Sequence, residues 1–258
     1  MNRIAALVRR HDPDRFLTAL FAPPERRDAL LTLYAFNHEL ARAREVVSEP
    51  PLALIRLQWW REVVEGARRR HEVAEPLAAA VEAGGLDRAD LTALIDAREI
   101  EADPSIDTLH AWRTYIRGSA GGLAVAAGRL LGAPDPEALR PLGAAYGIAG
   151  LLRSVPAHAA QGRCLLPADV LARDGLTPEQ VIANPAAEAV RTVTRRMSGE
   201  GTSLLGRIRL PRRAIAAALP AVLAKRDLAR APDFPTQRGL GDRIAVTLAG
   251  IVGGLTLR

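Results

Sequence analysis

The 258-residue sequence has a single cysteine, Cys164, and only 4% aromatic residues. One cysteine excludes an intramolecular disulfide, which favours a reducing compartment such as the cytoplasm. With so few aromatic rings, alanine, leucine, valine and isoleucine must build the core, and the first two favour helices. The first residues, 1–5, include no long apolar stretch, so we expect no secretory signal. The longest uncharged apolar run, residues 244–257, is shorter than the roughly 20 residues of a membrane span. We expect that run to form a buried terminal helix.

Lysine is almost absent as well, because Lys225 is the only one and arginine carries nearly all of the positive charge in a net charge of +6. Arginine binds phosphate and carboxylate groups through two parallel hydrogen bonds, which fits anionic partners. A coding bias toward arginine and alanine gives the same composition. No glycine-rich phosphate loop, zinc-ligand spacing or nucleic-acid module accompanies the arginines, so we expect no nucleic-acid partner.

Helical spacing of apolar residues prevails along the whole chain, without lasting strand alternation. Proline and glycine divide the pattern, and Asp87 and Thr177 stand at expected N-caps. Within residues 107–131, four glycines indicate close helix contact or a bound ligand. The predicted helical segments are one that opens at Pro23, residues 52–70, a shorter helix closed by Gly84 and Gly85, residues 87–101, 107–131, 139–156 and 167–175, a short helix from 177, and residues 186–208, 212–230 (interrupted at Pro220) and 240–257. Without a repeat or a linker, one domain over residues 1–258 is the simplest interpretation.

A series of short motifs resembles one enzyme family. Phe-Ala-Pro-Pro-Glu-Arg-Arg-Asp-Ala-Leu at 21–30 leads into Leu-Tyr-Ala-Phe at 33–36, and Trp-Trp-Arg-Glu follows at 59–62. Gly-x-x-Gly comes at 118–121, Leu-Leu-Arg at 151–153, Gly-Arg at 162–163 and Leu-Pro at 166–167. In this order they resemble the squalene/phytoene synthase family over residues 14–182. The resemblance implies an all-α, terpenoid-synthase-like (isoprenoid-synthase) helical bundle with a central cavity.

The family's enzymes join two prenyl diphosphates head to head, with magnesium held by an aspartate-rich motif on each of two facing helices. Magnesium prefers oxygen ligands and neutralises the charge of a departing diphosphate. In this sequence, the motif positions are occupied by Ala41, Arg42, Glu45, Ser154, Ala157 and His158. Only Glu45 is a carboxylate, and a single carboxylate does not make a multi-metal site. The resemblance therefore implies no bound metal and no cofactor here, and no catalytic residue is assigned.

A second set of residues is similar to one branch of that family. It consists of Ala-Phe-Asn-His-Glu-Leu-Ala at 35–41, Val-Ser-Glu at 47–49, Arg-Leu-Gln-Trp-Trp at 56–60 and Val-Val-Glu at 63–65. That branch contains a mitochondrial complex I assembly factor, and its aspartate motifs are eroded. The resemblance implies a role in assembling a respiratory NADH dehydrogenase, with a complex I subunit or an assembly intermediate as partner. It also implies peripheral association with the inner membrane.

Several polar residues near the lost motifs are candidates for binding within the cavity. A replacement ligand or partner site is one interpretation of the stretch Asn37, His38 and Glu39, and a polar helix side without such a role is the other. Glu45 is either a residual cation ligand or a carboxylate that is solvated or paired with arginine. His158 has no partner ligands in sequence, which makes it weak evidence for a site.

Two arginines match the family motifs at positions that suggest anion binding. Arg153 and Arg163 would hold a phosphate or a lipid headgroup directly. The structural alternative is helix capping or an ion pair with an acid such as Asp169.

The sequence thus supports two hypotheses. The first is a pseudoenzyme with the synthase fold, acting in respiratory complex I assembly or in binding an isoprenoid or lipid. The alternative is an active head-to-head prenyl-diphosphate synthase, a prenyltransferase that takes its magnesium ligands from elsewhere in the chain.

Overall fold

A computed structural model describes residues 3–47, 49–252 and 255–256. Ser48, in the middle of the motif at 47–49, lies outside them. The N-terminal half contains α1 (Arg3–His11), α2 (Pro13–Ala19), α3 (Pro24–Glu45), α4 (Pro50–Glu65), α5 (Ala74–Glu82), α6 (Arg88–Asp96), η1 (Glu99–Ala102), β1 (Ser105–Ile106), α7 (Leu109–Ile116), the π-helical turn η2 (Arg117–Gly121) and α8 (Gly122–Leu130).

The C-terminal half continues with η3 (Pro136–Leu139), α9 (Arg140–Arg153), α10 (Val155–Ala160), β2 (Cys164–Pro167), α11 (Ala168–Ala172), α12 (Pro178–Ala183), α13 (Glu188–Ser203), β3 (Arg207–Ile208), η4 (Arg212–Ala217), α14 (Pro220–Arg230), α15 (Leu240–Val252) and β4 (Leu255–Thr256). The strands are minor: β1 pairs in parallel with β2, and β3 pairs antiparallel with β4. The predicted all-helical class is therefore confirmed.

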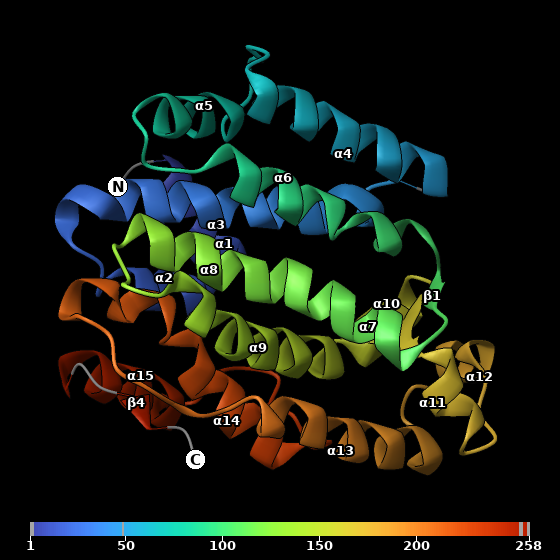
Figure 1. Cartoon of the computed structure of the whole chain (residues 1–258). Coiled ribbons are helices and arrows are strands. Elements are labelled where there is room, and N and C mark those ends of the chain that lie inside the picture. Colours follow the sequence, from blue (N-terminus) through green and yellow to red (C-terminus); the bar gives the residue numbers. More distant parts are fainter. Residues whose placement is uncertain (1–2, 48, 253–254, 257–258) are drawn as a thin grey trace.

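The long helices lie roughly side by side in stacked rows (Figure 1). In that view α4 and α5 are at the top, α3, α6 and α8 cross the middle, and α9, α13, α14 and α15 lie below. The central helix α3 is buried along most of its length, with Leu30, Leu33 and Phe36 fully enclosed. The core joins α3 to α8, α9 and α14. It is built mainly from alanine and aliphatic residues, as the low aromatic content predicts.

Local sequence signals set several helix ends. The Asp87 carboxylate accepts a hydrogen bond from the Ala89 backbone N–H (2.7 Å), which caps α6 as predicted. Thr177 and Gln180 form a capping box at the start of α12. The helix expected over 52–70 instead ends at Glu65, because Gly66 adopts a left-handed conformation (φ +119°) that stops it.

The glycines between α7 and α9 mark close backbone packing. A Cβ added at Gly128 would lie 2.2 Å from the Leu139 side chain, and one at Gly143 would lie 2.5 Å from the Ala120 carbonyl oxygen. Both distances are far below van der Waals contact, so glycine allows η3 to pack on α8 at Gly128 and α9 to pack on η2 and α8 at Gly143. For Gly128, close contact rather than a bound ligand accounts for the residue.

The C-terminal apolar run differs from its prediction as a buried helix. Residues 240–252 form α15, but Val246 and Gly250 are buried while Leu240, Ile244, Leu248, Ile251 and Val252 are 48% to 76% exposed. The prediction was wrong because the other side of α15 packs on α14 and α2 and leaves an aliphatic face uncovered. Among the described helices, none combines the length and hydropathy that a membrane span requires.

Candidate functional site

A cavity of about 890 Å³ opens between α2, α3, η2, α9 and the segment that leads into α15. The break between α9 and α10 helps to shape it. Ser154 ends α9, and Pro156 lies in the first turn of α10, where its missing N–H costs no hydrogen bond. Beside that break, Gly147 and Gly150 line the cavity with backbone alone. This volume is large enough for a small organic ligand or part of a lipid chain.

The structure brings together some of the degenerate motif positions across this cavity. Ala41 on α3 and Ser154 and His158 on the opposite side all line it. The three remaining positions lie outside its wall. Arg42 pairs with Glu39 at 3.5 Å, while Glu45 and Ala157 are exposed.

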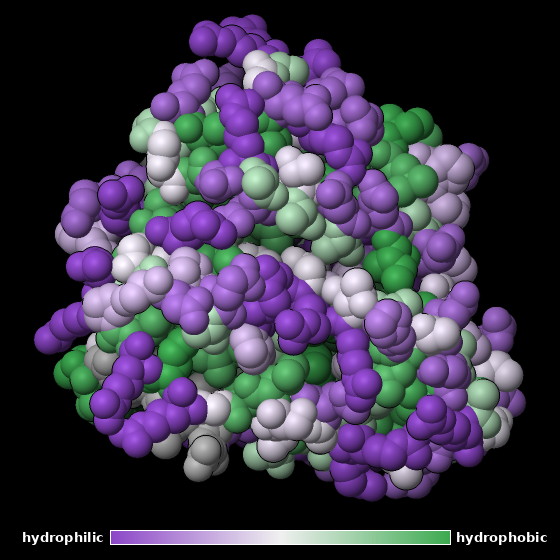
Figure 2. All heavy atoms as spheres, viewed as in Figure 1, coloured by the Kyte–Doolittle hydropathy of each residue, from purple (hydrophilic) through white to green (hydrophobic). Residues whose placement is uncertain are grey.

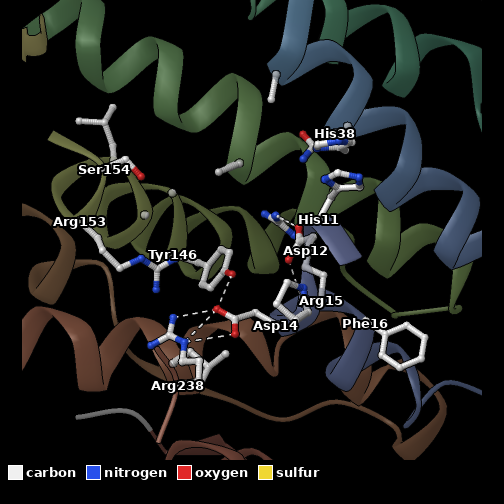
Figure 3. A pocket seen from close by; sticks show the side chains of 18 of the residues that line it. His11, Asp12, Asp14, Arg15, Phe16, His38, Tyr146, Arg153, Ser154 and Arg238 are labelled. Atoms are coloured by element: carbon white, nitrogen blue, oxygen red, sulfur yellow. Dashed lines mark hydrogen bonds and ion pairs between the residues drawn. The ribbon is translucent and has the colours of Figure 1, made fainter. Parts of the chain in front are cut away.

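Of the other candidates on α3, two line the cavity and one does not. Asn37 lines the cavity, and its side-chain oxygen accepts a hydrogen bond from Arg98 (3.1 Å). His38 also lines it and stacks on His11 with ring centroids 4.5 Å apart (Figure 3). Burial, reinforced by the neighbouring His11, lowers the pKa of His38, and its buried Nε2 has no hydrogen-bond partner. Glu39 is buried but does not contribute to the cavity wall.

The two predicted arginines have different surroundings. Arg153 lines the cavity and donates to the Asp227 carboxylate at 3.1 Å. Arg163 is buried away from the wall and donates to the Glu101 carbonyl oxygen at 3.2 Å. The structural alternative, an ion pair with an acid, describes both arginines, since Arg163 also lies 3.8 Å from the Glu101 carboxylate. The acid is not the suggested Asp169, whose carboxylate accepts the backbone N–H of Leu109 at the start of α7.

A buried polar cluster around Glu101 was not predicted from the sequence. The Glu101 carboxylate accepts hydrogen bonds from Arg98 (2.5 Å) and from the Tyr115 hydroxyl (2.6 Å), and Arg163 lies 3.8 Å from it. Burial, together with the Glu101 charge, raises the pKa of Tyr115 well above its usual value. Arg98 and Tyr115 line the cavity, so this cluster presents a fixed cation and a phenol beside Asn37.

A second missed cluster comes from the two ends of the chain. The Asp14 carboxylate accepts hydrogen bonds from the Tyr146 hydroxyl (3.1 Å) and from Arg238 (2.8 Å), as Figure 3 shows. Arg238 also donates to Asp227 at 2.7 Å, and Asp227 in turn binds Arg153. The network therefore ties α2, α9 and α14 together at the floor of the cavity. In the sequence, the only signal for this cluster is that acidic residues, Asp12 and Asp14, stand at the start of a helix.

The carboxylates of the cavity wall are all engaged by arginine. Asp12 pairs with Arg15 at 2.8 Å, Asp14 with Arg238, and Asp242 with Arg226 and Arg230. A guanidinium beside a carboxylate occupies the oxygen atoms that a cation would need.

The motif positions offer no replacement ligands. Burial, with Arg163 nearby, lowers the pKa of His158 to about 4, so its imidazole is neutral at pH 7. Magnesium prefers oxygen to such a nitrogen ligand. Over residues 3–47, 49–252 and 255–256, no group of three acidic, histidine or cysteine residues is placed to hold a metal. The residues present therefore do not fit the magnesium cluster of a prenyl-diphosphate synthase.

Comparisons with known proteins identify the class to which this fold and cavity belong. Residues 8–247 match the family model for squalene/phytoene synthase. The fold resembles a crystal structure of squalene synthase from Alicyclobacillus acidocaldarius, with a TM-score of 0.67, 21% identity, and coverage of 88% of this chain and 90% of that one. It also resembles a dehydrosqualene synthase solved with a ligand, with a TM-score of 0.68, 15% identity, and coverage of 96% and 94%.

The chain belongs to the squalene/phytoene synthase family, and its predicted isoprenoid-synthase fold is confirmed. It is 30% identical over 195 residues to NADH dehydrogenase (ubiquinone) complex I, assembly factor 6 of Rattus norvegicus, and 29% identical to that of Homo sapiens. Each alignment covers 72% of this chain and 59% of the relative, so the chain spans less than two thirds of their length. A presqualene diphosphate synthase of Sinorhizobium fredii is 25% identical over 180 residues, covering 64% and 62%.

Proposed function

We propose that this chain is a non-catalytic member of its family that contributes to the assembly of respiratory complex I. The observation that carries the proposal is the arginine pairing of every cavity carboxylate, Asp12, Asp14 and Asp242. Ionisation of a diphosphate needs metal ions that bridge protein carboxylates and the leaving group. The similarity to assembly factor 6 relatives supports the assembly role.

In this proposal the cavity binds an isoprenoid or a related lipid without turnover. Its wall combines apolar surface from Phe16, Leu17 and Ile116 with arginine side chains. Arg9 and Arg243 contribute to the wall, and their guanidinium groups form no ion pair or hydrogen bond with any described residue. Guanidinium groups of this kind bind an anionic headgroup directly while the apolar wall covers the chain.

We further propose that complex I subunits or an assembly intermediate are the partners, and that the protein works at the surface of the inner membrane. The relatives named as assembly factors support the choice of partner. The net charge of +6 supports attraction to an anionic membrane surface.

Genetic complementation tests the assembly role. Deleting the gene in its host should lower the amount of assembled NADH dehydrogenase, measured on native gels and as membrane NADH oxidation. A plasmid copy should restore both. A copy with Glu45→Gln, which removes the last motif carboxylate, should restore them equally well because Glu45 is exposed and outside the cavity. An unchanged amount of complex I after deletion would refute the assembly role. If the Glu45→Gln copy did not restore complex I, the result would support a function that depends on a metal bound by Glu45.

A further inference from the structure

The exposed face of α15 is unusual for a helix that ends a folded core. Leu240, Ile244, Leu248 and Ile251 recur at spacings of three and four residues, so they form one continuous aliphatic stripe. Val252 extends the stripe at its end, and in Figure 2 hydrophobic side chains lie at the lower left, where Figure 1 places α15. Single exposed aliphatic residues are common, but a contiguous stripe on a helix marks an interaction surface.

The opposite face of α15 is fixed in place, so the stripe cannot turn inward. Asp242, which is 1% exposed, binds Arg226 and Arg230 on α14. Further along, Gly250 packs against the Phe21 ring, and a Cβ there would lie 2.5 Å from it. These contacts hold α15 against α14 and α2 and direct the stripe outward.

The helix that carries the stripe also contributes Asp242 and Arg243 to the cavity wall, and positive charge lies beside the stripe there. The exposed residues of the cavity wall include Leu20, at the end of α2, and Arg243, next to Ile244 on α15. Arg9 is exposed in the same wall, and neither arginine forms an ion pair with a described residue. The surface thus combines an aliphatic stripe with uncompensated cations beside an open cavity.

We propose that the α15 stripe is the surface by which this protein docks on an anionic phospholipid bilayer, with the cavity mouth facing the lipid. An aliphatic face bordered by arginine matches the interface between acyl chains and phosphate headgroups. Protein-binding surfaces are instead enriched in aromatic residues and methionine, and the stripe has neither. The inference rests on the proposed location at a membrane surface and is independent of the assembly role.

Vesicle cosedimentation of the purified chain tests this surface. The probes are vesicles of phosphatidylcholine alone and vesicles with equal amounts of phosphatidylcholine and phosphatidylglycerol. We expect binding to the anionic vesicles, weakened about tenfold or more by the double variant Ile244→Ser and Leu248→Ser, which removes aliphatic area from the stripe. Arg243→Gln should weaken it by about fivefold and reduce the preference for the anionic lipid.

A matched double variant provides the control. Leu54→Ser with Ile55→Ser removes two exposed aliphatic residues from α4, which lies at the other end of the molecule in Figure 1. This variant should bind vesicles as the unmodified chain does. Absence of vesicle binding, or equal loss in both double variants, would overturn the proposal. So would a concentration-dependent dimer in analytical ultracentrifugation that only the α15 variant abolishes, because the stripe would then bind a second copy. None of these results bears on the complementation test, so the two failures are distinguishable.

Discussion

Arg238 binds the Asp14 carboxylate at 2.8 Å across a separation of 224 residues along the chain. The same guanidinium also donates to Asp227, so two carboxylates that are 8% and 1% exposed share one cation. An ion pair this enclosed depends on both partners, because removing one leaves the other buried and unpaired. Arg238 therefore joins the segment before α15 to α2 and α14 and completes the floor of the cavity.

Replacing Arg238 should destabilise the whole fold. We expect Arg238→Gln to lower the free energy of unfolding by about 3 kcal/mol, since the buried Asp14 would lose its ion pair while Asp227 would keep Arg153 at 3.1 Å. Urea denaturation followed by circular dichroism measures the change. Arg191→Gln is the matched control, because Arg191 pairs with the exposed Asp233 at 2.8 Å and should cost less than about 1 kcal/mol. Equal losses in the two variants would contradict this view of the network.

Acid should weaken the fold through His158. Burial lowers its pKa from 6.5 to about 4, so below pH 6.5 the unfolded chain binds a proton that the folded chain does not. The free energy of unfolding therefore does not depend on His158 above pH 6.5 and decreases as the pH falls from 6.5 toward 4, with a slope of at most about 1.4 kcal/mol per pH unit. The lowered pKa of His38 acts in the same direction.

A histidine variant isolates this effect. His158→Gln should flatten the pH dependence of the unfolding free energy over that range, measured by urea denaturation at several pH values. His110→Gln changes an exposed residue on α7 and should leave the slope as it is. A slope unchanged by His158→Gln would show that other groups cause the acid sensitivity.

Filling the cavity should abolish ligand binding without unfolding the protein. A Cβ added at Gly150 meets no atom within 4 Å, and Gly150 lines the cavity, so Gly150→Leu places a side chain in the open space. Leucine also favours the helix over glycine by up to about 1 kcal/mol, which preserves α9.

Native mass spectrometry of the purified chain measures the result. We expect a retained isoprenoid or lipid on the unmodified protein and none on Gly150→Leu. The control is Gly199→Leu on α13, where the added Cβ again meets nothing within 4 Å but the residue is exposed and outside the cavity. A ligand that stays on Gly150→Leu binds elsewhere.

Magnesium should have no effect on thermal stability. A ligand raises the midpoint of unfolding only if it binds the folded state, and the cavity carboxylates Asp12, Asp14 and Asp242 are engaged by arginine. We expect midpoints within about 1 °C in magnesium and in a chelator at equal ionic strength. A midpoint that rises with magnesium concentration would demonstrate a metal site.

Local signals in the sequence predicted much of the fold. Asp87 and Thr177 cap their helices because short polar side chains reach the free N–H groups of the first turn. The helix predicted over 52–70 is too long at its end, because the left-handed conformation of Gly66 stops the observed helix at Glu65. Residues 240–257 were expected to be one buried helix, but which face of α15 is covered depends on its packing against Phe21 and α14.

The cavity was harder to predict than the fold. Motif alignment located Ala41, Ser154 and His158, which the structure places around one cavity. The ion pair of Asp14 and Arg238 in its wall was missed because the two residues lie near opposite ends of the chain. Glu101, which holds the wall residues Arg98 and Tyr115, was missed because it lies in a short 3₁₀ turn. Pairing between such distant residues leaves no periodic signal in a single sequence.

The most direct test of the central claim is the release of diphosphate. Incubation of the purified chain with farnesyl or geranylgeranyl diphosphate and magnesium, beside a blank without protein, measures ionisation of the substrate. A wall without free carboxylates predicts no magnesium-dependent release above the blank. Release at rates of about 1 per second or faster, typical of enzymes, would show an active prenyltransferase and contradict the account.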